Sequence, residues 1–336
     1  MEFHKPLGRA LKYTVLKRLA ERRAGYAVET ASSGVPAAFV IGCGRSGTTI
    51  LGDVLDQHPA VYYFFEPYHL WATIDPVSDV TNLYGVGACK FIMDQDDCTA
   101  ESRRRFSLLF QEPAMRAGAE LVVEKTPFNA CRIGYLESIK PQSRFVHIVR
   151  DGIDVARSIA RLSTDDSYKI AGKPGRSRWW GRNECKWDAL ATDGMAAGYF
   201  PDEVAQLKDY QAKGAYEWLV SLAEVDRWRD HLGDRLLEIT YDELTAQPRR
   251  TLAEICDFLG VSKQQPWLEG CVRKIDQTRH NSGEQLVLPP GMCEEFNQRQ
   301  ISYGFTGRSR PSKEAVPHLR SAYKVAQFFG AQAYPA

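Results

Sequence analysis

The sequence predicts an α/β protein in which a parallel central sheet is flanked by helices. Two observations carry this prediction. Short apolar runs alternate with segments of helical periodicity, as in parallel sheets that are covered on both faces. One of these runs leads into a glycine-rich loop, FVIGCGRSGTT, that precedes a helical pattern and resembles a phosphate-binding loop. A length of 336 residues and an apolar content of 44% suit one domain with a large core and some additions.

Five apolar runs are the predicted strands, and segments with helical periodicity separate them. The predicted strands are 37–42, 61–66, 120–125, 144–150 and 236–241. The predicted helices are 48–57, a stretch within 99–117, 131–139, 154–161, 212–232 and 251–260. In an open parallel sheet, ligands bind at the carboxyl ends of the strands, so we expect the functional residues there.

The segment 163–212 breaks this alternation and is rich in glycine, aspartate and aromatic residues. We expect it to be an insertion or lid over the acceptor side of the site. Its tryptophans, Trp179, Trp180 and Trp187, leave two alternatives open. They form a small additional core, or they are a platform on which a substrate ring stacks.

The first 34 residues form a separate basic segment. Residues 1–23 hold seven basic and two acidic side chains, and Leu7, Leu11, Val15 and Leu19 recur every four residues. This spacing predicts an amphipathic basic helix. Two interpretations remain open: a helix packed on the rest of the enzyme or frayed from it, and a peripheral contact with an anionic membrane surface.

Composition narrows the class of protein. The 43 basic and 42 acidic residues nearly cancel, which argues against nucleic-acid binding through global charge. No apolar run is long enough to span a membrane, and the N-terminus lacks the apolar core of a signal peptide. The eight cysteines include no C-x-x-C pair. We therefore expect a cytoplasmic protein with free thiols, and no metal site.

The loop after the first strand has the spacing of a phosphate-binding loop but not its lysine. Gly42 and Gly47 are separated by four residues, and Thr48 stands where a nucleoside-triphosphate hydrolase carries the lysine that contacts the β- and γ-phosphates. Arg45 is the nearest cation, and Thr49 adds a second hydroxyl. These groups predict a site for a phosphate that bears another anionic group, without a requirement for magnesium.

Three elements in order, GRSGTT, RFVHIVRDGIDVARS and EITYDELTAQPRRTLAEICDFLGV, resemble the sulfotransferases that use 3′-phosphoadenosine 5′-phosphosulfate, abbreviated PAPS. The resemblance covers residues 37–262 and implies a P-loop-like sulfotransferase domain over 35–336. It implies that the first loop holds the 5′-phosphosulfate, with arginine at position 45 as in Golgi and bacterial members. It also implies that Arg150 and Ser158 bind the 3′-phosphate and that Tyr241 approaches the adenine. The implied loop residues are Arg45, Ser46, Gly47, Thr48 and Thr49.

Sulfonate transfer to a hydroxyl requires a base and a cation near the transferred group. Several carbohydrate members of the family use a glutamate after the second strand, and Glu66 in FFEPYH matches it. His69 is the alternative base, and a structural carboxylate paired with Arg45 is the alternative role for Glu66. Lys125 at the end of VVEK is the candidate second cation, unless it is a solvated strand-end lysine. His147, inside an apolar strand, is interpreted as a core residue.

The resemblance predicts transfer of a sulfonate from PAPS to an acceptor hydroxyl, with Glu66 as general base and Arg45 and Lys125 as catalytic cations. A carbohydrate or glycolipid acceptor is favoured over a small metabolite and a peptide tyrosine. Arg308 and Arg310 are candidates for a basic loop that closes over the nucleotide. The alternatives are a P-loop kinase, for which Asp151 would hold magnesium, and a nucleotide-binding regulatory protein.

Overall fold

A parallel five-stranded sheet forms the centre of the protein. The computed structural model describes residues 4–26, 34–84, 87–164, 176–177, 179–275 and 285–312, and the side chains of these residues except 4–13, 176 and 177. The strand order is β2-β3-β1-β4-β7, and every neighbouring pair is parallel. This arrangement confirms the predicted fold class. The strands are β1 (Ala37–Ile41), β2 (Val61–Phe65), β3 (Leu121–Lys125), β4 (Arg144–Val149) and β7 (Leu236–Thr240).

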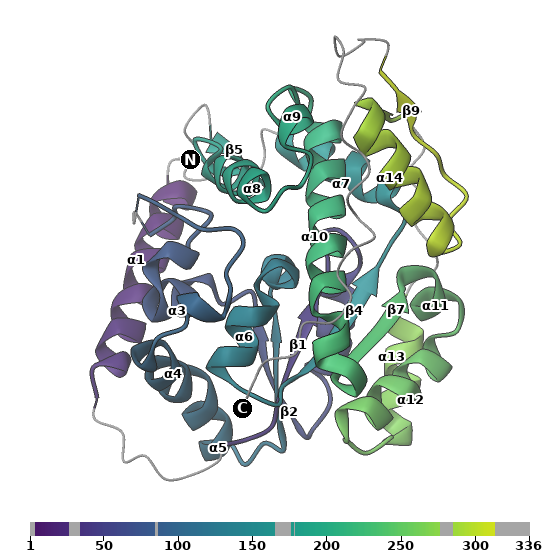
Figure 1. Ribbon diagram of the computed structural model, residues 1–336. Helices are drawn as coiled ribbons and strands as arrows, with labels where there is room; N and C mark the ends of the chain where they lie inside the picture. Colours follow the sequence, from purple (N-terminus) through teal and green to yellow (C-terminus); the bar gives the residue numbers. More distant parts are fainter. Residues whose placement is uncertain are drawn as a thin grey trace, which may run out of the picture.

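Helices surround the sheet. In Figure 1, α1 and α3 to α6 lie on the left, α11 to α13 on the right, and α8, α9 and α14 at the top. The helices are α1 (His4–Ala24), α2 (Thr48–Leu55), α3 (Tyr68–Ile74), α4 (Ala100–Phe106), α5 (Glu112–Arg116), α6 (Ile133–Ile139), α7 (Gly152–Thr164), α8 (Cys185–Ala196), α9 (Pro201–Val204), α10 (Tyr210–Leu232), α11 (Tyr241–Ala246), α12 (Pro248–Leu259), α13 (Gln265–Lys274) and α14 (Pro290–Ser302).

The central strand β1 shows why its sequence is apolar at every position. All five of its residues are buried. Ala38 and Val40 belong to the core formed with α2, α12 and α13, whereas Phe39 and Ile41 belong to the core formed with α4, α6 and α10. A strand with a helical layer on each face has no solvent-facing side, so alternation of polar and apolar residues is absent.

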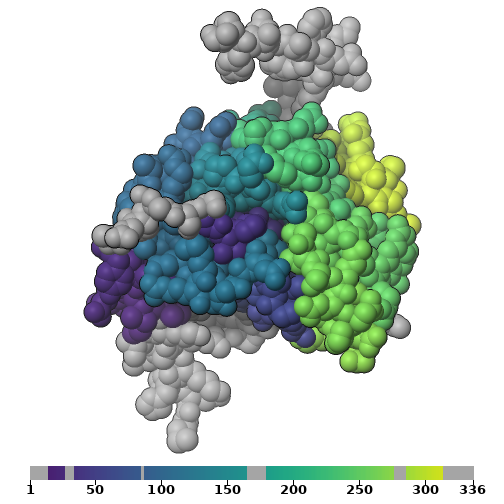
Figure 2. Space-filling model, turned by 90° about the horizontal axis from the view of Figure 1, so that it is seen from below, coloured from purple at the N-terminus to yellow at the C-terminus, as the bar shows by residue number. Residues whose placement is uncertain are grey.

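The predicted helix at the N-terminus exists, but it uses a different face from the one predicted. Ala20 and Ala24 are the buried residues of α1, and they join the core that contains Trp71 of α3. Val15 and Leu19 of the predicted apolar stripe are 45% and 58% exposed. Small side chains let α1 approach α3 closely. The side chains of Leu7 and Leu11, the other members of the predicted stripe, lie outside the described residues. Figure 2 shows α1 in purple at one edge of the molecule and the segment 241–275 in light green at the opposite edge.

The aromatic-rich segment 163–212 contributes helices of its own. It contains α8, α9 and the short strands β5 (Arg176–Ser177) and β6 (Gly181–Arg182), which pair with each other. Trp180 and Trp187 are 0% and 9% exposed, and both belong to the core cluster that α7 and α10 also supply. The platform alternative is therefore wrong for these two tryptophans, and the core that they join is a main core rather than a small additional one.

Among the residues that the structure describes, no helix combines the length and the apolar character that crossing a bilayer requires.

Candidate active site

The loop between β1 and α2 turns with backbone angles that favour glycine. Gly42 and Gly47 have φ angles of 145° and 100°, and Arg45 between them has a φ of 74°. A side chain at Gly42 would collide with the carbonyl oxygen of Ile148 in β4. Gly47 caps α2 without a side-chain hydrogen bond, so the amide groups of the first turn have no carboxylate or hydroxyl as a capping partner.

Ser46 in this loop fits an anion. Its side chain is 1% exposed, and its Oγ has no hydrogen-bond partner among the described residues. A buried hydroxyl without a partner is costly unless a ligand supplies one. Together with the amide groups at the start of α2, the Ser46 hydroxyl makes the loop a suitable cradle for a phosphate or sulfate group. Thr48 is also buried, whereas Thr49 is exposed.

The structure joins the loop to the second predicted element. The Nε of Arg45 donates a hydrogen bond to Oγ of Ser158 over 3.0 Å. Ser158 lies on α7, 113 residues further along the chain, and is 3% exposed. Arg45 itself is exposed. Its guanidinium therefore lies between the two regions that the sequence suggested for two different phosphate groups.

Arg150 follows β4 and lies beside the same loop. Its guanidinium donates to Oδ2 of Asp154 over 2.7 Å, and Nη1 lies 3.4 Å from the carbonyl oxygen of Arg45. The ring of Tyr241, the first residue of α11, has its centroid 4.6 Å from Cζ of Arg150. The same ring blocks any side chain at Gly47. Arg150, Tyr241 and the phosphate loop thus form one continuous surface.

The Asp154 carboxylate is a partner that the sequence reasoning missed. Its spacing of four residues from Arg150 on the start of a helix was the signal that indicates such a pair. Both side chains are only about one tenth exposed, at 11% for Arg150 and 10% for Asp154. The pair fixes the orientation of the guanidinium, so the cation is held in place before a ligand arrives.

The predicted base and the predicted second cation contact each other. Lys125 ends β3, its side chain is 0% exposed, and its Nζ donates to Oε1 of Glu66 over 2.6 Å and to Oγ1 of Thr49 over 3.2 Å. The alternative in which Glu66 pairs with Arg45 is therefore wrong, because the ion-pair partner of Glu66 is Lys125. The alternative of a solvated Lys125 is also wrong, because its side chain is fully buried. Strands β2 and β3 are neighbours, and Phe65 is in register with Lys125.

Glu66 has an unusual backbone conformation. Its φ is 40°, in the left-handed region that residues with a Cβ rarely adopt. The side chain is 24% exposed, so it remains accessible to a ligand. Residues held in sparsely populated backbone conformations cluster at functional sites, where the surrounding structure compensates for their cost.

Two aromatic side chains beside Glu66 were missed by the sequence reasoning. The hydroxyl of Tyr68 donates to Oε2 of Glu66 over 3.0 Å, and its ring stacks on Phe128 with centroids 5.7 Å apart. The ring of Phe65 lies 4.1 Å from Nζ of Lys125, yet Phe65 is 52% exposed. The aromatic density of VYYFFEPYH was the available signal.

His69, the alternative base, points elsewhere. It lines a groove between α1 and β2 together with Leu19, Tyr62 and Phe64. His147 is 0% exposed, as expected for a core residue, and its Nδ1 lies 2.7 Å from Oε2 of Glu238. Its Nε2 has no hydrogen-bond partner among the described residues.

Glu124, next to Lys125 in sequence, lies on the opposite face of β3 in full burial. Burial raises its pKa to about 7, and hydrogen bonds from Thr126, Trp71 and Asn129 limit the rise. The bond from Trp71 has a length of 3.0 Å and tethers α3, whose first residue is Tyr68. Glu124 therefore helps to hold the helix that orients Glu66.

The predicted closing loop near the C-terminus folds back toward the start of α7. A side chain at Gly307 would lie 3.1 Å from Oδ2 of Asp151. The guanidinium of Arg308 donates to the carbonyl oxygens of Phe305 and Gly307 in its own loop. Arg310 is exposed in β9 (Arg310–Pro311), which pairs with β8 (Val287–Leu288).

Within the described ranges, no cluster of three or more histidine, cysteine, aspartate or glutamate side chains is arranged to hold a metal ion.

Comparisons with known proteins find similarity to sulfotransferases. A family model described as "Sulfotransferase family" matches residues 36–183, which include the phosphate loop, Glu66, Lys125, Arg150 and Ser158. Nodulation protein NoeE of Sinorhizobium fredii (strain NBRC 101917 / NGR234) is 28% identical over 128 residues, which are 36% of this chain and 30% of that protein. Carbohydrate sulfotransferase 6 of Homo sapiens is 36% identical over 85 residues, which are 24% of this chain and 22% of that protein.

These alignments span less than a third of the length of either relative. Among solved structures, the sulfotransferase domain from the Synechococcus PCC 7002 olefin synthase covers 83% of this chain and 98% of its own, with 19% identity and a TM-score of 0.49. The matched segment carries the first two sequence elements and contains four of the five strands of the central sheet, β1 to β4. Residues 36–183 of this chain are thus similar to the sulfotransferase family.

Proposed function

We propose that the protein transfers a sulfonate group from PAPS to the hydroxyl of an acceptor. The observation that carries the proposal is the hydrogen bond of 3.0 Å between Arg45 and Ser158, because it connects two anion-binding regions into one site. The phosphate loop with Ser46 suits the phosphosulfate end of the donor. Arg150 and Ser158 suit a second phosphate on the same nucleotide. Tyr241 adds an aromatic face for its base.

The chemistry that we propose needs a base and cations that this chain supplies. The donor, when bound, supplies an activated sulfonate. Glu66 accepts the proton of the acceptor hydroxyl as the new bond between oxygen and sulfur forms and the bond from sulfur to the leaving phosphate oxygen breaks. Lys125 and Arg45 neutralise the negative charge that develops on the transferred group and on the leaving phosphate. Tyr68 and Lys125 orient the carboxylate of Glu66.

A carbohydrate hydroxyl is the acceptor that we propose. Phe65 supports this, since it exposes an aromatic face of the kind on which sugar rings stack, and it precedes Glu66 directly. The name of the relative carbohydrate sulfotransferase 6 points the same way. A screen with radiolabelled donor against sugars, glycolipids, phenols and tyrosine peptides tests the class. Phe65→Ala should raise the KM of a sugar acceptor about threefold to tenfold, and the donor KM should stay unchanged. A phenol as the preferred substrate would contradict the proposal.

A P-loop kinase is the competing function, and the contacts of Asp151 argue against it. Its Oδ1 accepts hydrogen bonds from the backbone amides of Ile153 and Asp154, over 2.8 and 3.2 Å. This is the geometry of a helix cap, so the Asp151 carboxylate has a structural role at the start of α7. The kinase and the regulatory protein also leave the Arg150 and Ser158 pair without a role.

Thermal unfolding tests the donor assignment. Adenosine 3′,5′-bisphosphate, the product of the donor, should raise the melting temperature without magnesium, and ATP with magnesium should raise it much less. Stronger stabilisation by ATP with magnesium would favour a kinase or a nucleotide-binding regulatory protein.

A cytoplasmic location with a peripheral membrane contact remains a prediction. The membrane contact is supported by Val15 and Leu19, which are exposed on α1 next to the exposed Arg18 and Arg22. Sedimentation with anionic vesicles, compared with neutral vesicles, measures this contact, and equal sedimentation with both would contradict an electrostatic contribution.

A further inference from the structure

Trp179, from the aromatic-rich insertion, packs on the phosphate loop. A Cβ atom added to Gly44 would lie 2.8 Å from Cζ2 of the Trp179 indole and closer still to Cη2. Apart from Gly44 and its two chain neighbours, the three described atoms nearest to that Cβ position all belong to the Trp179 indole. Gly44 has no positive φ. The absence of a side chain at position 44 therefore serves the contact with Trp179 rather than an unusual backbone angle.

A buried ion pair fixes the indole. Nε1 of Trp179 donates to Oε2 of Glu217 over 2.8 Å, and Nζ of Lys186 donates to Oε1 of the same carboxylate over 2.7 Å. The Nζ of Lys186 also lies 4.0 Å from the centroid of the Trp179 ring. The side chains of Lys186 and Glu217 are 6% and 1% exposed. The indole is thus held by a hydrogen bond at its edge and by a cation at its face.

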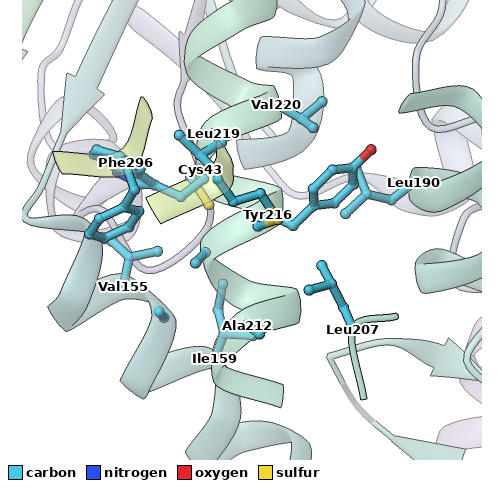
Figure 3. Close-up of a cluster of buried hydrophobic side chains, with 14 of the residues drawn as sticks. Cys43, Val155, Ile159, Leu190, Leu207, Ala212, Tyr216, Leu219, Val220 and Phe296 are labelled. Carbon is cyan, nitrogen blue, oxygen red and sulfur yellow. The ribbon is translucent and has the colours of Figure 1, made fainter. Parts of the chain in front are cut away.

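The ion pair lies close to the loop itself. Figure 3 shows Cys43, the neighbour of Gly44, among core side chains of α7, α8, α10 and α14. Burial raises the pKa of the Cys43 thiol, the Glu217 carboxylate raises it further, and the Lys186 ammonium lowers it, so both charges of the pair lie near the loop. Two buried charges cost more in desolvation than they commonly return in stability. Their presence here calls for a role other than packing, and neither charge takes part in the proposed chemistry.

We infer that Trp179 is a positioning residue for the phosphate loop. The buried pair of Lys186 and Glu217 holds the Trp179 indole against Gly44, and the indole keeps the loop in the conformation that binds the donor. This inference rests on the proposed function. Glu217 lies on α10 and Lys186 on α8, so three segments distant in sequence converge on one glycine of the loop. The insertion thereby contributes to donor binding, in addition to any part it has in the acceptor site. Small displacements of groups that hold a reacting ligand are costly in rate, so a fixed loop is an advantage.

A double-mutant cycle on Gly44 and Trp179 tests the inference, with the affinity of the purified full-length protein for adenosine 3′,5′-bisphosphate measured by calorimetry. Gly44→Ala should weaken binding tenfold or more, because the new methyl group displaces the loop or the indole. In the Trp179→Ala background the same change should cost less than threefold, since the obstructing ring is gone. Gly270→Ala on α13 is the matched control, because its methyl group meets open space and should leave affinity unchanged.

Two further variants separate positioning from general stability. Trp179→Phe keeps a ring on Gly44 and loses the bond to Glu217, so it should bind the bisphosphate more tightly than Trp179→Ala does. Trp179→Ala should lose affinity about threefold to tenfold while the KM of the acceptor changes less. Equal costs of Gly44→Ala in both backgrounds, or unchanged affinity in Trp179→Ala, would overturn the inference. Failure of the wild-type protein to bind the bisphosphate would instead overturn the proposed function.

Discussion

Replacing Glu66 with glutamine keeps the shape of the side chain and removes its basicity. In the wild-type protein, Lys125 and the hydroxyl of Tyr68 donate hydrogen bonds to the two carboxylate oxygens of Glu66 over 2.6 and 3.0 Å. The glutamine amide can still accept a hydrogen bond from Lys125 and contact the hydroxyl of Tyr68. The variant therefore preserves the geometry of the site. It removes the base and the charge that pairs with Lys125, with little change of shape.

The expected loss of turnover is about a hundredfold to ten-thousandfold, the usual contribution of a general base. This range corresponds to about 2.7–5.4 kcal/mol of activation free energy. The stability of the fold should change by less than the ~3–5 kcal/mol that follows the loss of one partner from a fully buried ion pair, because the Glu66 side chain is 24% exposed. Lys125 also retains its bond to Thr49.

The assay is turnover with labelled donor at saturating acceptor, together with the affinity for adenosine 3′,5′-bisphosphate. Affinity should remain within a few fold of the wild-type value. Tyr68→Phe is the matched control, because it removes one hydrogen bond to Glu66 and keeps the base, so it should reduce turnover by only about tenfold or less. Near-normal turnover of Glu66→Gln would refute the assignment. A large loss in His69→Ala in that case would identify His69 as the base.

Two further predictions concern the donor site and the buried carboxyl of Glu124. Arg150→Ala should weaken binding of PAPS or its bisphosphate product about tenfold to a hundredfold, through the loss of a charge-assisted contact, and should hardly affect adenosine 5′-phosphosulfate, which lacks the 3′-phosphate. Arg150→Ala also removes the cation that neutralises the Asp154 carboxylate near the phosphate, so Arg150→Ala/Asp154→Ala should recover part of the loss. Equal losses for both nucleotides in Arg150→Ala would show that Arg150 does not recognise the 3′-phosphate. Burial raises the pKa of Glu124 from 4.5 to about 7. Between these two pH values the folded protein keeps a proton on Glu124 that the unfolded chain has released. The free energy of unfolding should therefore fall as the pH rises from about 4.5 to 7, by at most about 1.4 kcal/mol per pH unit. Urea unfolding of Glu124→Gln should lack this decline, and an unchanged pH dependence would contradict it.

Much of the architecture was predictable because it depends on local sequence. The inner strands β1, β3 and β4 are buried on both faces and are therefore nearly continuous apolar runs. The edge strands β2 and β7 are partly buried but also rich in apolar residues, and all five strands were found within one residue of their observed limits. The phosphate loop was recognisable from its glycines, two of which have the positive φ angles that glycine adopts readily. The strand ends then located Glu66, Lys125 and Arg150 at one edge of the sheet, since parallel strands end on the same side.

Other features of the site depend on contacts between distant residues. The pairing of Glu66 with Lys125 follows from the adjacency of β2 and β3, which are separated by more than fifty residues in sequence. The contact of Trp179 with Gly44 requires α8 and α10 to bring the buried Lys186 and Glu217 together. A sequence pattern records which residues are apolar or charged, but not which of them meet.

The sequence by itself determined the resemblance to sulfotransferases, the order of strands and helices along the chain, and the side chains available for binding and catalysis. Only the tertiary structure decided the partners: that Lys125 pairs with Glu66, that Arg45 bonds to Ser158, that α1 docks through Ala20 and Ala24, and that Trp180 is a core residue. The physical reason is the distance along the chain over which each kind of interaction acts. Backbone propensity and hydrophobic period act over a few residues, whereas ion pairs and packing form between groups that folding alone brings within a few ångströms.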